Sequence, residues 1–298
     1  TMLKAGVRFK LWLADYFAFI NNKLGGDLNR IHKAGEYFIE VWKACGIDIN
    51  KVEVIWASER MNKLEYWDRV LKIAKETTLN RSIRATTIMG RKEKELQSTA
   101  QLFYPSMQVS DIFELEVNIC QLGLDQRRAN ILGREIADKL NWRKPVVVSH
   151  HMILGLQGIQ PGADKEETIL ASKMSKSKPE TCIYMHDTEE DIKKKIAKAF
   201  CPEKIIEGNP LFDYLKYLIC KKYPKINIKR PDKFGGNIEL SYSELEQQYI
   251  SGEIHPLDLK NTVIFYLNDL IQPIRKYFET NKKAKELYEE VKKYSVTR

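Results

Sequence analysis

The first half of the chain alternates short apolar runs with segments of helical periodicity, and this alternation constrains the fold most. The runs at 9–14 and 52–56 are short, apolar and rich in aromatic or β-branched residues, as buried strands are. Between them, Asp27 precedes a segment whose apolar residues recur at helical spacing as far as Gly46, which predicts an N-capped helix. Because a connection between parallel strands needs a dozen or more residues, the alternation predicts a parallel sheet.

The pattern continues to about residue 150 and then changes. Strands are expected at 117–120 and 145–148, with a helix at 126–140 between them, and an amphipathic stretch covers 63–87. Beyond residue 180 the chain shows helical segments and no convincing parallel strand. These segments are 189–200, 211–223, 243–249, 256–278 and 282–294. We therefore expect an α/β domain over 1–180 and an all-helical domain over 181–298.

Charge and cysteine content narrow the class of protein. The net charge of +9 favours a polyanionic partner, and no apolar run approaches the roughly 20 residues that span a bilayer. The five cysteines form no CxxC pair, which argues against a disulfide framework or a zinc site. A reducing, intracellular setting is the default expectation.

One predicted helix presents a stripe of three polar side chains. Tyr104, Gln108 and Asp111 stand at i, i+4 and i+7, so they share a face. A phenol, an amide and a carboxylate together can hold an ammonium group and a second polar end of a small ligand. From these residues alone, a hydrogen-bonded helix face is the more economical interpretation. Gln126 opens the next helix directly after a strand, where open α/β sheets bind their ligands.

A lysine- and serine-rich run lies between a glycine-containing loop and Pro179. It reads Lys173, Met174, Ser175, Lys176, Ser177. Two lysines on a loop can deliver ammonium groups to a polyphosphate whose charge grows during a reaction. A solvated surface loop is the alternative for such a short run.

The run matches the second signature of class I aminoacyl-tRNA synthetases, and the chain resembles the archaeal and eukaryotic tyrosyl-tRNA synthetases over nearly its whole length. The resembling segments are LADYFAFIN at 13–21, YPSMQVSD at 104–111, CQLGLDQRR at 120–128, KMSKS at 173–177, AFCPEKIIEGNP at 199–210, KRPDKFGG at 229–236 and HPLDLKN at 255–261. The resemblance implies a Rossmann-like catalytic domain over 1–180, with a dimerisation segment at about 60–100. It also implies a helical anticodon-binding domain over 181–298.

The resemblance also implies roles for individual residues. Tyr104, Gln108 and Gln126 would bind the amino group of tyrosine, and Asp111 would accept a hydrogen bond from its phenol. Trp12 and Ala14 would line the tyrosine pocket, with Trp12 bulkier than the family residue. Phe17 replaces a histidine of many archaeal relatives. Lys173 and Lys176 would be catalytic, and residues 173–177 would bind ATP.

Five further residues match tRNA-binding positions of the family. Arg84 and Arg127 would read the first base pair of the acceptor stem, and Phe234, His255 and Asp258 would read the anticodon. Each of the last three has a structural alternative. His255 could cap a helix, Asp258 could be a first-turn carboxylate that the helix dipole favours, and Phe234 could belong to the core.

The predicted function is ATP-dependent attachment of tyrosine to tRNA(Tyr) through a tyrosyl-adenylate, by a cytoplasmic homodimer that uses Mg²⁺. The first class I signature, the HIGH-like histidine pair, should precede Thr1, so we expect an N-terminal segment that the sequence lacks. Two alternatives stay open at this stage. One is a tryptophanyl-tRNA synthetase, and the other is a non-catalytic RNA-binding relative that has lost the ATP site.

Overall fold

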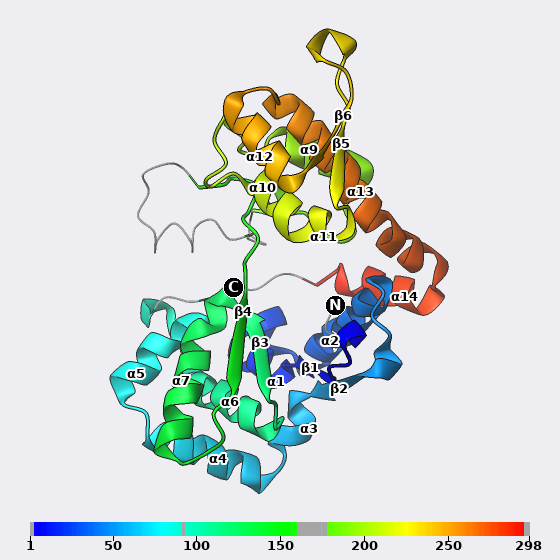
Figure 1. Cartoon of the computed structure of the whole chain (residues 1–298). Coiled ribbons are helices and arrows are strands. Elements are labelled where there is room, and N and C mark those ends of the chain that lie inside the picture. Colours follow the sequence, from blue (N-terminus) through cyan, green and yellow to red (C-terminus); the bar gives the residue numbers. More distant parts are fainter. Residues whose placement is uncertain (1–2, 91–92, 160–173, 175–177, 295–298) are drawn as a thin grey trace. The chain divides into compact units, whose positions relative to one another are not determined.

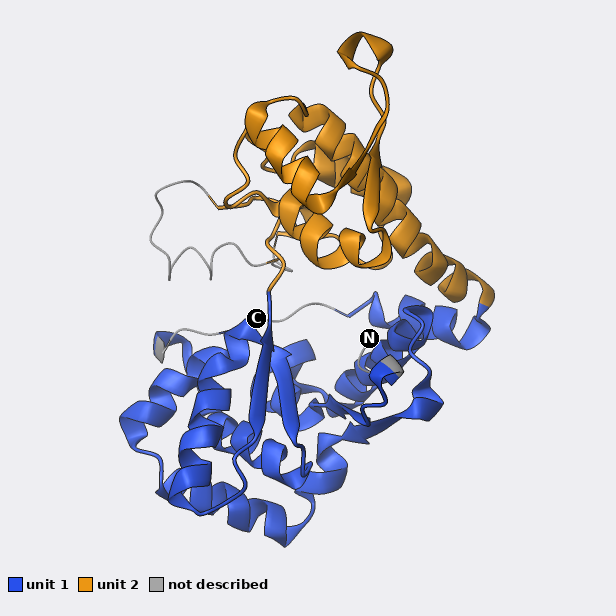
Figure 2. Cartoon of the chain, viewed as in Figure 1, with its two compact units in different colours: residues 1–151, 281–298 blue, residues 152–280 orange. Residues whose placement is uncertain are grey.

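The computed structural model describes residues 3–90, 93–159, 174 and 178–294, which form two compact units. Unit 1 comprises residues 1–151 together with 281–298, and unit 2 comprises residues 152–280 (Figure 2). The chain thus crosses between the units twice. The predicted division into an α/β domain and a helical domain at residue 180 stays a prediction. In the described part of the chain, no helix is both long and apolar enough to cross a membrane.

Unit 1 begins with a parallel strand pair. Strand β1 (Phe9–Leu13) pairs with β2 (Val52–Trp56), with Phe9 opposite Val52. The connection contains α1 (Asp15–Ile20) and α2 (Leu28–Ala44). Three short 3-10 turns precede β1, α2 and β2. These turns are η1 (Leu3–Ala5), η2 (Lys23–Gly26) and η3 (Ile49–Lys51). Asp27 caps α2 by accepting hydrogen bonds from two backbone N–H groups, as its position in the sequence predicts.

A second parallel pair lies further along unit 1. Strand β3 (Ile119–Gly123) pairs with β4 (Val146–His150) across α7 (Arg127–Lys139) (Figure 1). Strand β3 starts two residues later than predicted. Glu116, with a φ of 50°, takes the left-handed conformation that ends the preceding helix α6 (Ala100–Glu114). The parallel direction is confirmed in both pairs. Among the described residues, however, the two pairs are separate sheets and not one continuous sheet.

Helices fill the stretch between the two strand pairs. They are α3 (Ala57–Met61), α4 (Leu64–Lys75), α5 (Leu79–Ala85) and α6 (Ala100–Glu114). The 3-10 turns η4 (Thr86–Met89) and η5 (Glu93–Glu95) lie between α5 and α6. A further 3-10 turn, η6 (Leu124–Gln126), follows β3 and precedes α7. The amphipathic stretch at 63–87 contains the two helices α4 and α5. The break comes at Thr78, whose hydroxyl accepts from the backbone N–H of Arg81 and begins α5.

The last helix of the chain belongs to unit 1. Helix α14 (Lys282–Val291) packs against α2. The rings of Tyr37 and Tyr288 stack with centroids 6.2 Å apart, and the guanidinium of Arg30 lies over the ring of Tyr294 at 5.8 Å. These aromatic contacts attach the C-terminal segment to the N-terminal half of the chain.

Unit 2 is mainly helical but contains a β-hairpin. Its helical elements are η7 (Pro179–Thr181), α9 (Glu189–Ala197), α10 (Pro210–Tyr214), the π-helical turn η8 (Leu215–Ile219), α11 (Cys220–Lys222), η9 (Asp232–Phe234), α12 (Tyr242–Ser251) and α13 (Pro256–Thr280). Strands β5 (Lys225–Ile228) and β6 (Ile238–Ser241) pair antiparallel. The prediction of an all-helical second domain is therefore wrong.

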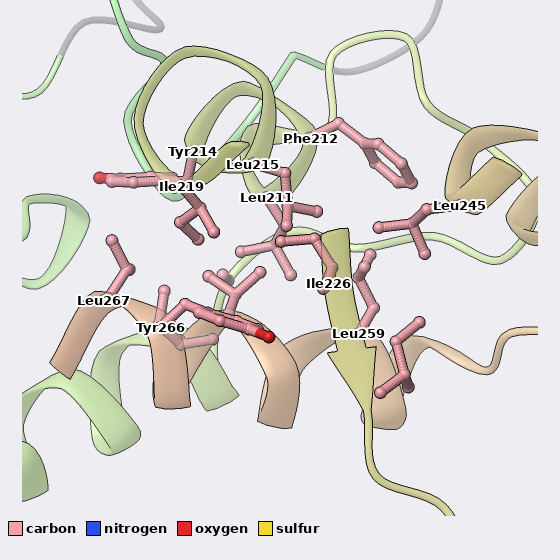
Figure 3. Packing of buried hydrophobic residues seen from close by; sticks show 14 of the residues in the cluster. Leu211, Phe212, Tyr214, Leu215, Ile219, Ile226, Leu245, Leu259, Tyr266 and Leu267 are labelled. Atoms are coloured by element: carbon pink, nitrogen blue, oxygen red, sulfur yellow. The ribbon is translucent and has the colours of Figure 1, made fainter. Parts of the chain in front are cut away.

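The hairpin escapes sequence analysis because each strand has only four residues and a turn-rich segment surrounds β5. Its core-facing side chains nevertheless alternate as a strand requires. Ile226 and Ile228 are fully buried, whereas Lys225 and Asn227 are exposed. Figure 3 shows Ile226 among the apolar side chains of α10, η8 and α13, which form the core of unit 2.

Candidate functional site

A cavity of about 1370 Å³ in unit 1 gathers the residues predicted to bind tyrosine. Strands β1 and β3 and helix α6 each contribute residues to its walls. The predicted residues that line it are Trp12, Ala14, Tyr104, Gln108, Asp111 and Gln126. The helical spacing of the stripe on α6 thus places all three of its side chains on the cavity side. Their assigned roles stay predictions.

Among these lining residues, hydrogen bonds hold the amide side chains of Gln108 and Gln126 in place. Gln108 Nε2 donates to Gln126 Oε1 over 3.0 Å, and Gln126 Nε2 donates to the backbone oxygen of Ile88 over 3.0 Å and to Asp125 Oδ2 over 3.1 Å. This chain of hydrogen bonds orients both amides before any ligand arrives. Oriented amide oxygens can accept hydrogen bonds from an ammonium group.

Asp111 is the buried carboxylate of the cavity. Only 6% of its surface is exposed, and Oδ1 accepts a hydrogen bond from Tyr66 Oη over 2.7 Å. Burial raises the pKa of Asp111 well above its usual range, while the Tyr66 hydroxyl and the indole of Trp12 oppose that rise. Sequence analysis missed Tyr66 because it lies on the apolar face of α4 with Val70 and Ile73, a spacing typical of core residues.

An aromatic pair completes the wall next to the stripe. Phe17 and Tyr104 meet edge to face, with ring centroids 4.9 Å apart. Burial, followed by the charges of Asp111 and Asp125, raises the pKa of Tyr104 to about 12. Tyr104 therefore stays a neutral phenol at physiological pH and can both donate and accept a hydrogen bond.

Asp15 joins the carboxyl ends of β1 and β2 beside this cavity. Its Oδ1 accepts from the backbone N–H of Ser58 at 3.0 Å, and its Oδ2 lies 3.0 Å from Nε2 of His32 on α2. The side chain is 3% exposed. A buried carboxylate with several partners fixes the backbone at the strand ends, and this includes Ala14.

The predicted ATP-binding run lies largely outside the described residues. Lys173, Ser175, Lys176 and Ser177 are not among them, and only Met174 is. Met174 packs against the apolar core of unit 2, and its sulfur lies 4.0 Å from Tyr214 Oη. The lysine assignments therefore rest on the sequence.

The two arginines predicted to contact the acceptor stem are exposed on neighbouring elements of unit 1. Arg84 lies in the last turn of α5, and Arg127 is the first residue of α7. Arg128 joins these elements, since its Nη1 donates to the backbone oxygen of Arg84 and to Thr87 Oγ1.

Unit 2 holds the three residues predicted to read the anticodon. Phe234 is 61% exposed in the turn between β5 and β6, so it does not belong to the core. His255 Nδ1 accepts from the backbone N–H of Leu257, which is the capping role that its position also allowed. Asp258 lies in the first turn of α13. Arg230 Nη1 donates to the backbone oxygen of Glu253 and so ties the hairpin to the loop before α13.

Comparison with known proteins places the chain in a family. The model of class I tRNA synthetases (W and Y) matches residues 1–272. The chain belongs to this family. The family includes enzymes for tryptophan and enzymes for tyrosine. The relatives that are similar to this chain over its whole length indicate which of the two groups it resembles.

Those members are named for tyrosine. The chain is 45% identical to tyrosine--tRNA ligase 1, cytoplasmic, of Arabidopsis thaliana, over all of this chain and 75% of that protein. It is 42% identical to tyrosine--tRNA ligase of Saccharolobus solfataricus, over all of this chain and 83% of that protein. The crystal structure of tyrosyl-tRNA synthetase complexed with L-tyrosine from Pyrococcus horikoshii matches with a TM-score of 0.88. That match has 41% identity and covers 97% of this chain and 83% of that one. The predicted tyrosyl-tRNA synthetase family is thereby confirmed.

Proposed function

We propose that the chain catalyses the ATP-dependent attachment of tyrosine to tRNA. One observation supports this function above others: in a member of the W and Y family, a single cavity gathers Tyr104, Gln108, Gln126 and Asp111. An ammonium group and a phenol are the two polar ends of tyrosine, and these side chains have the chemistry to bind one at each end. Tryptophan has an indole N–H that could donate to Asp111, so substrate choice is the first thing to test.

The reaction proceeds in two steps. The carboxylate of tyrosine attacks the α-phosphorus of ATP, which forms tyrosyl-adenylate and releases pyrophosphate. The terminal ribose hydroxyl of tRNA then takes the tyrosyl group and releases AMP. Oriented amides such as Gln108 and Gln126 hold the amino acid in place, because positioning lowers the barrier of a reaction between two bound molecules.

Charge on the transferring phosphate requires cations. Lys173 and Lys176 supply ammonium groups to the α-phosphate region, where negative charge develops during the attack. Mg²⁺ bound to the phosphates of ATP would neutralise part of their charge. Among the described residues, no group of three or more His, Cys, Asp or Glu side chains is placed to hold a metal ion.

The tRNA uses residues of both units. Arg84 and Arg127 contact the acceptor stem, and Phe234, His255 and Asp258 contact the anticodon. This assignment makes residues 1–180 the catalytic domain and residues 181–298 the anticodon-binding domain. Phe234 offers an aromatic face on which an unstacked base can stack.

A homodimer is part of the proposal. Helix α4 exposes an apolar stripe at the spacing of one helix face, with Leu64 81% and Leu71 60% exposed, and Leu79 at the start of α5 is 65% exposed. Apolar stripes of this kind favour burial against a partner. The stripe lies within the segment at 60–100 that sequence analysis assigned to dimerisation.

The Arabidopsis relatives named as cytoplasmic support a cytoplasmic location.

The substrate assignment is tested by amino-acid-dependent pyrophosphate exchange. The protein should comprise residues 1–298 with any residues that precede them in the natural polypeptide. We expect exchange with tyrosine and not with tryptophan or phenylalanine. Asp111→Asn should lower kcat/KM for tyrosine roughly 10- to 100-fold, because a hydrogen bond to a charged group contributes about 1.5–3 kcal/mol.

The KM for ATP serves as the internal control for Asp111→Asn, and it should stay unchanged. Asparagine keeps one acceptor oxygen, so equal activity of the variant and the parent with tyrosine would show that the negative charge of Asp111 does not hold the phenol. Pyrophosphate exchange that depends on tryptophan would show that tryptophan, and not tyrosine, is the substrate.

A further inference from the structure

Tyr66 is a buried tyrosine whose hydroxyl contacts the carboxylate of the proposed pocket. Its side chain has no exposed surface and packs with Phe17, Met61, Val70 and Met107. Tyr66 Oη lies 2.7 Å from Asp111 Oδ1 and 3.2 Å from the backbone oxygen of Met107. A hydroxyl has one proton, so the shorter contact with the charged group receives it.

The groups that face Asp111 come from four elements. Helix α4 contributes Tyr66 and Arg69, α6 contributes Glu114 and Tyr104, β3 contributes Cys120 and β1 contributes Trp12. Arg69 is committed to Glu114, since its Nη1 lies 2.8 Å from Oε2 of that residue. The buried indole of Trp12 faces the carboxylate and opposes the rise of its pKa, but its Nε1 makes no hydrogen bond of normal geometry among the described residues. Tyr66 therefore provides the short hydrogen bond that fixes the carboxylate.

We propose that Tyr66 is a positioning residue, whose hydrogen bond to Oδ1 of Asp111 leaves Oδ2 to accept from the substrate phenol. This inference rests on the proposed function, in which Asp111 receives that phenol. Tyr66 itself does not touch the substrate. It acts by fixing the rotation of the carboxylate and by stabilising its negative charge where the side chain is buried.

The charge state of Asp111 gives the proposal a measurable sign. An ionised carboxylate only accepts hydrogen bonds, whereas a protonated one donates from one oxygen and accepts poorly there. Burial raises the pKa of Asp111, and the Tyr66 hydroxyl opposes this rise. Removal of the hydroxyl should raise the pKa of Asp111 further. Tyrosine activation should then fail at a higher pH when the solution is acidified.

The variant Tyr66→Phe removes the hydroxyl and keeps the ring that packs in the core. In pyrophosphate exchange it should lower kcat/KM for tyrosine roughly 10- to 100-fold at neutral pH, by the worth of a hydrogen bond to a charged group. The acid limb of the pH profile should move to higher pH, and the KM for ATP should stay unchanged. Tyr16→Phe is the matched control, because Tyr16 packs against the same apolar cluster without contacting Asp111.

A double-mutant cycle with Asp111→Asn separates positioning from folding. If Tyr66 acts through Asp111, then Tyr66→Phe should have little further effect on kcat/KM for tyrosine in the Asp111→Asn protein. Additive losses, or an equal loss at every pH in Tyr66→Phe, would overturn the proposal. So would a Tyr66→Phe profile identical to that of the parent.

The same cycle distinguishes this proposal from the proposed function. An Asp111→Asn protein with full tyrosine activity removes the role of the Asp111 charge in the pocket, and the role of Tyr66 with it. An impaired Asp111→Asn protein beside an unimpaired Tyr66→Phe protein removes the role of Tyr66 alone.

Discussion

Two different roles can explain why an aspartate stands at position 258. It lies in the first turn of α13, where any carboxylate interacts favourably with the helix dipole. A carboxylate can also accept hydrogen bonds from the ring and exocyclic N–H groups of guanine. The two roles predict different losses, because helix stabilisation affects every activity and base recognition affects only steps that use tRNA.

We therefore expect Asp258→Ala to impair aminoacylation and to spare tyrosyl-adenylate formation. The loss with a tRNA that has guanine at the first anticodon position should be about 1–3 kcal/mol, the usual size for a base-edge contact. Aminoacylation and pyrophosphate exchange measured side by side give the comparison.

Glu190→Ala provides the control for the dipole effect, since Glu190 is also a first-turn carboxylate and is largely exposed on α9. Parallel losses in both assays for Asp258→Ala would mean that Asp258 supports the fold of unit 2. The anticodon role would then be withdrawn.

Helix α2 connects and contacts several elements of unit 1. It follows β1, leads to β2 and receives α14 on its surface. Its start is defined by Asp27, whose side chain satisfies two backbone donors that the helix itself leaves unpaired. Loss of this cap should destabilise unit 1.

Asp27→Ala should lower the free energy of unfolding by about 1 kcal/mol, measured by urea denaturation. Asp27→Asn keeps a capping oxygen and should stay within a few tenths of the parent. The ion pair between Asp27 and Arg30 is exposed in both partners, so it contributes little to the difference. An equal effect of Ala and Asn would assign the stability to the charge and not to the cap.

At the scale of the whole molecule, the proposed homodimer would bury the exposed apolar stripe on α4. Leu64 and Leu71 are large apolar side chains that water contacts in the single chain. Burying such side chains in an interface contributes roughly 1.5–3 kcal/mol each, whereas burying a glutamate in their place opposes association.

The double variant Leu64→Glu, Leu71→Glu should therefore sediment as a monomer where the parent sediments as a dimer. Ile250→Glu introduces a glutamate at an exposed apolar position of unit 2, so it should leave the dimer intact. Dimers of unchanged stability in the double variant would place the interface elsewhere, and a monomeric parent would refute the homodimer.

Local features of this protein could be predicted from sequence because short-range physics decides them. The cap at Asp27, the helix that follows it, the parallel direction of the strands and the shared face of Tyr104, Gln108 and Asp111 all depend on spacing along the chain. Motif spacing likewise sufficed to indicate the family, which the comparisons confirm.

Contacts between distant segments were decided only by the tertiary structure. Tyr66 and Asp111 are 45 residues apart, and nothing in the apolar spacing of α4 shows that one of its core positions carries a hydroxyl for a buried carboxylate. The β5–β6 hairpin and the return of α14 to α2 are equally non-local. Burial of side chains that meet from separate elements fixes these arrangements, and a one-dimensional pattern records only that a residue is apolar or polar.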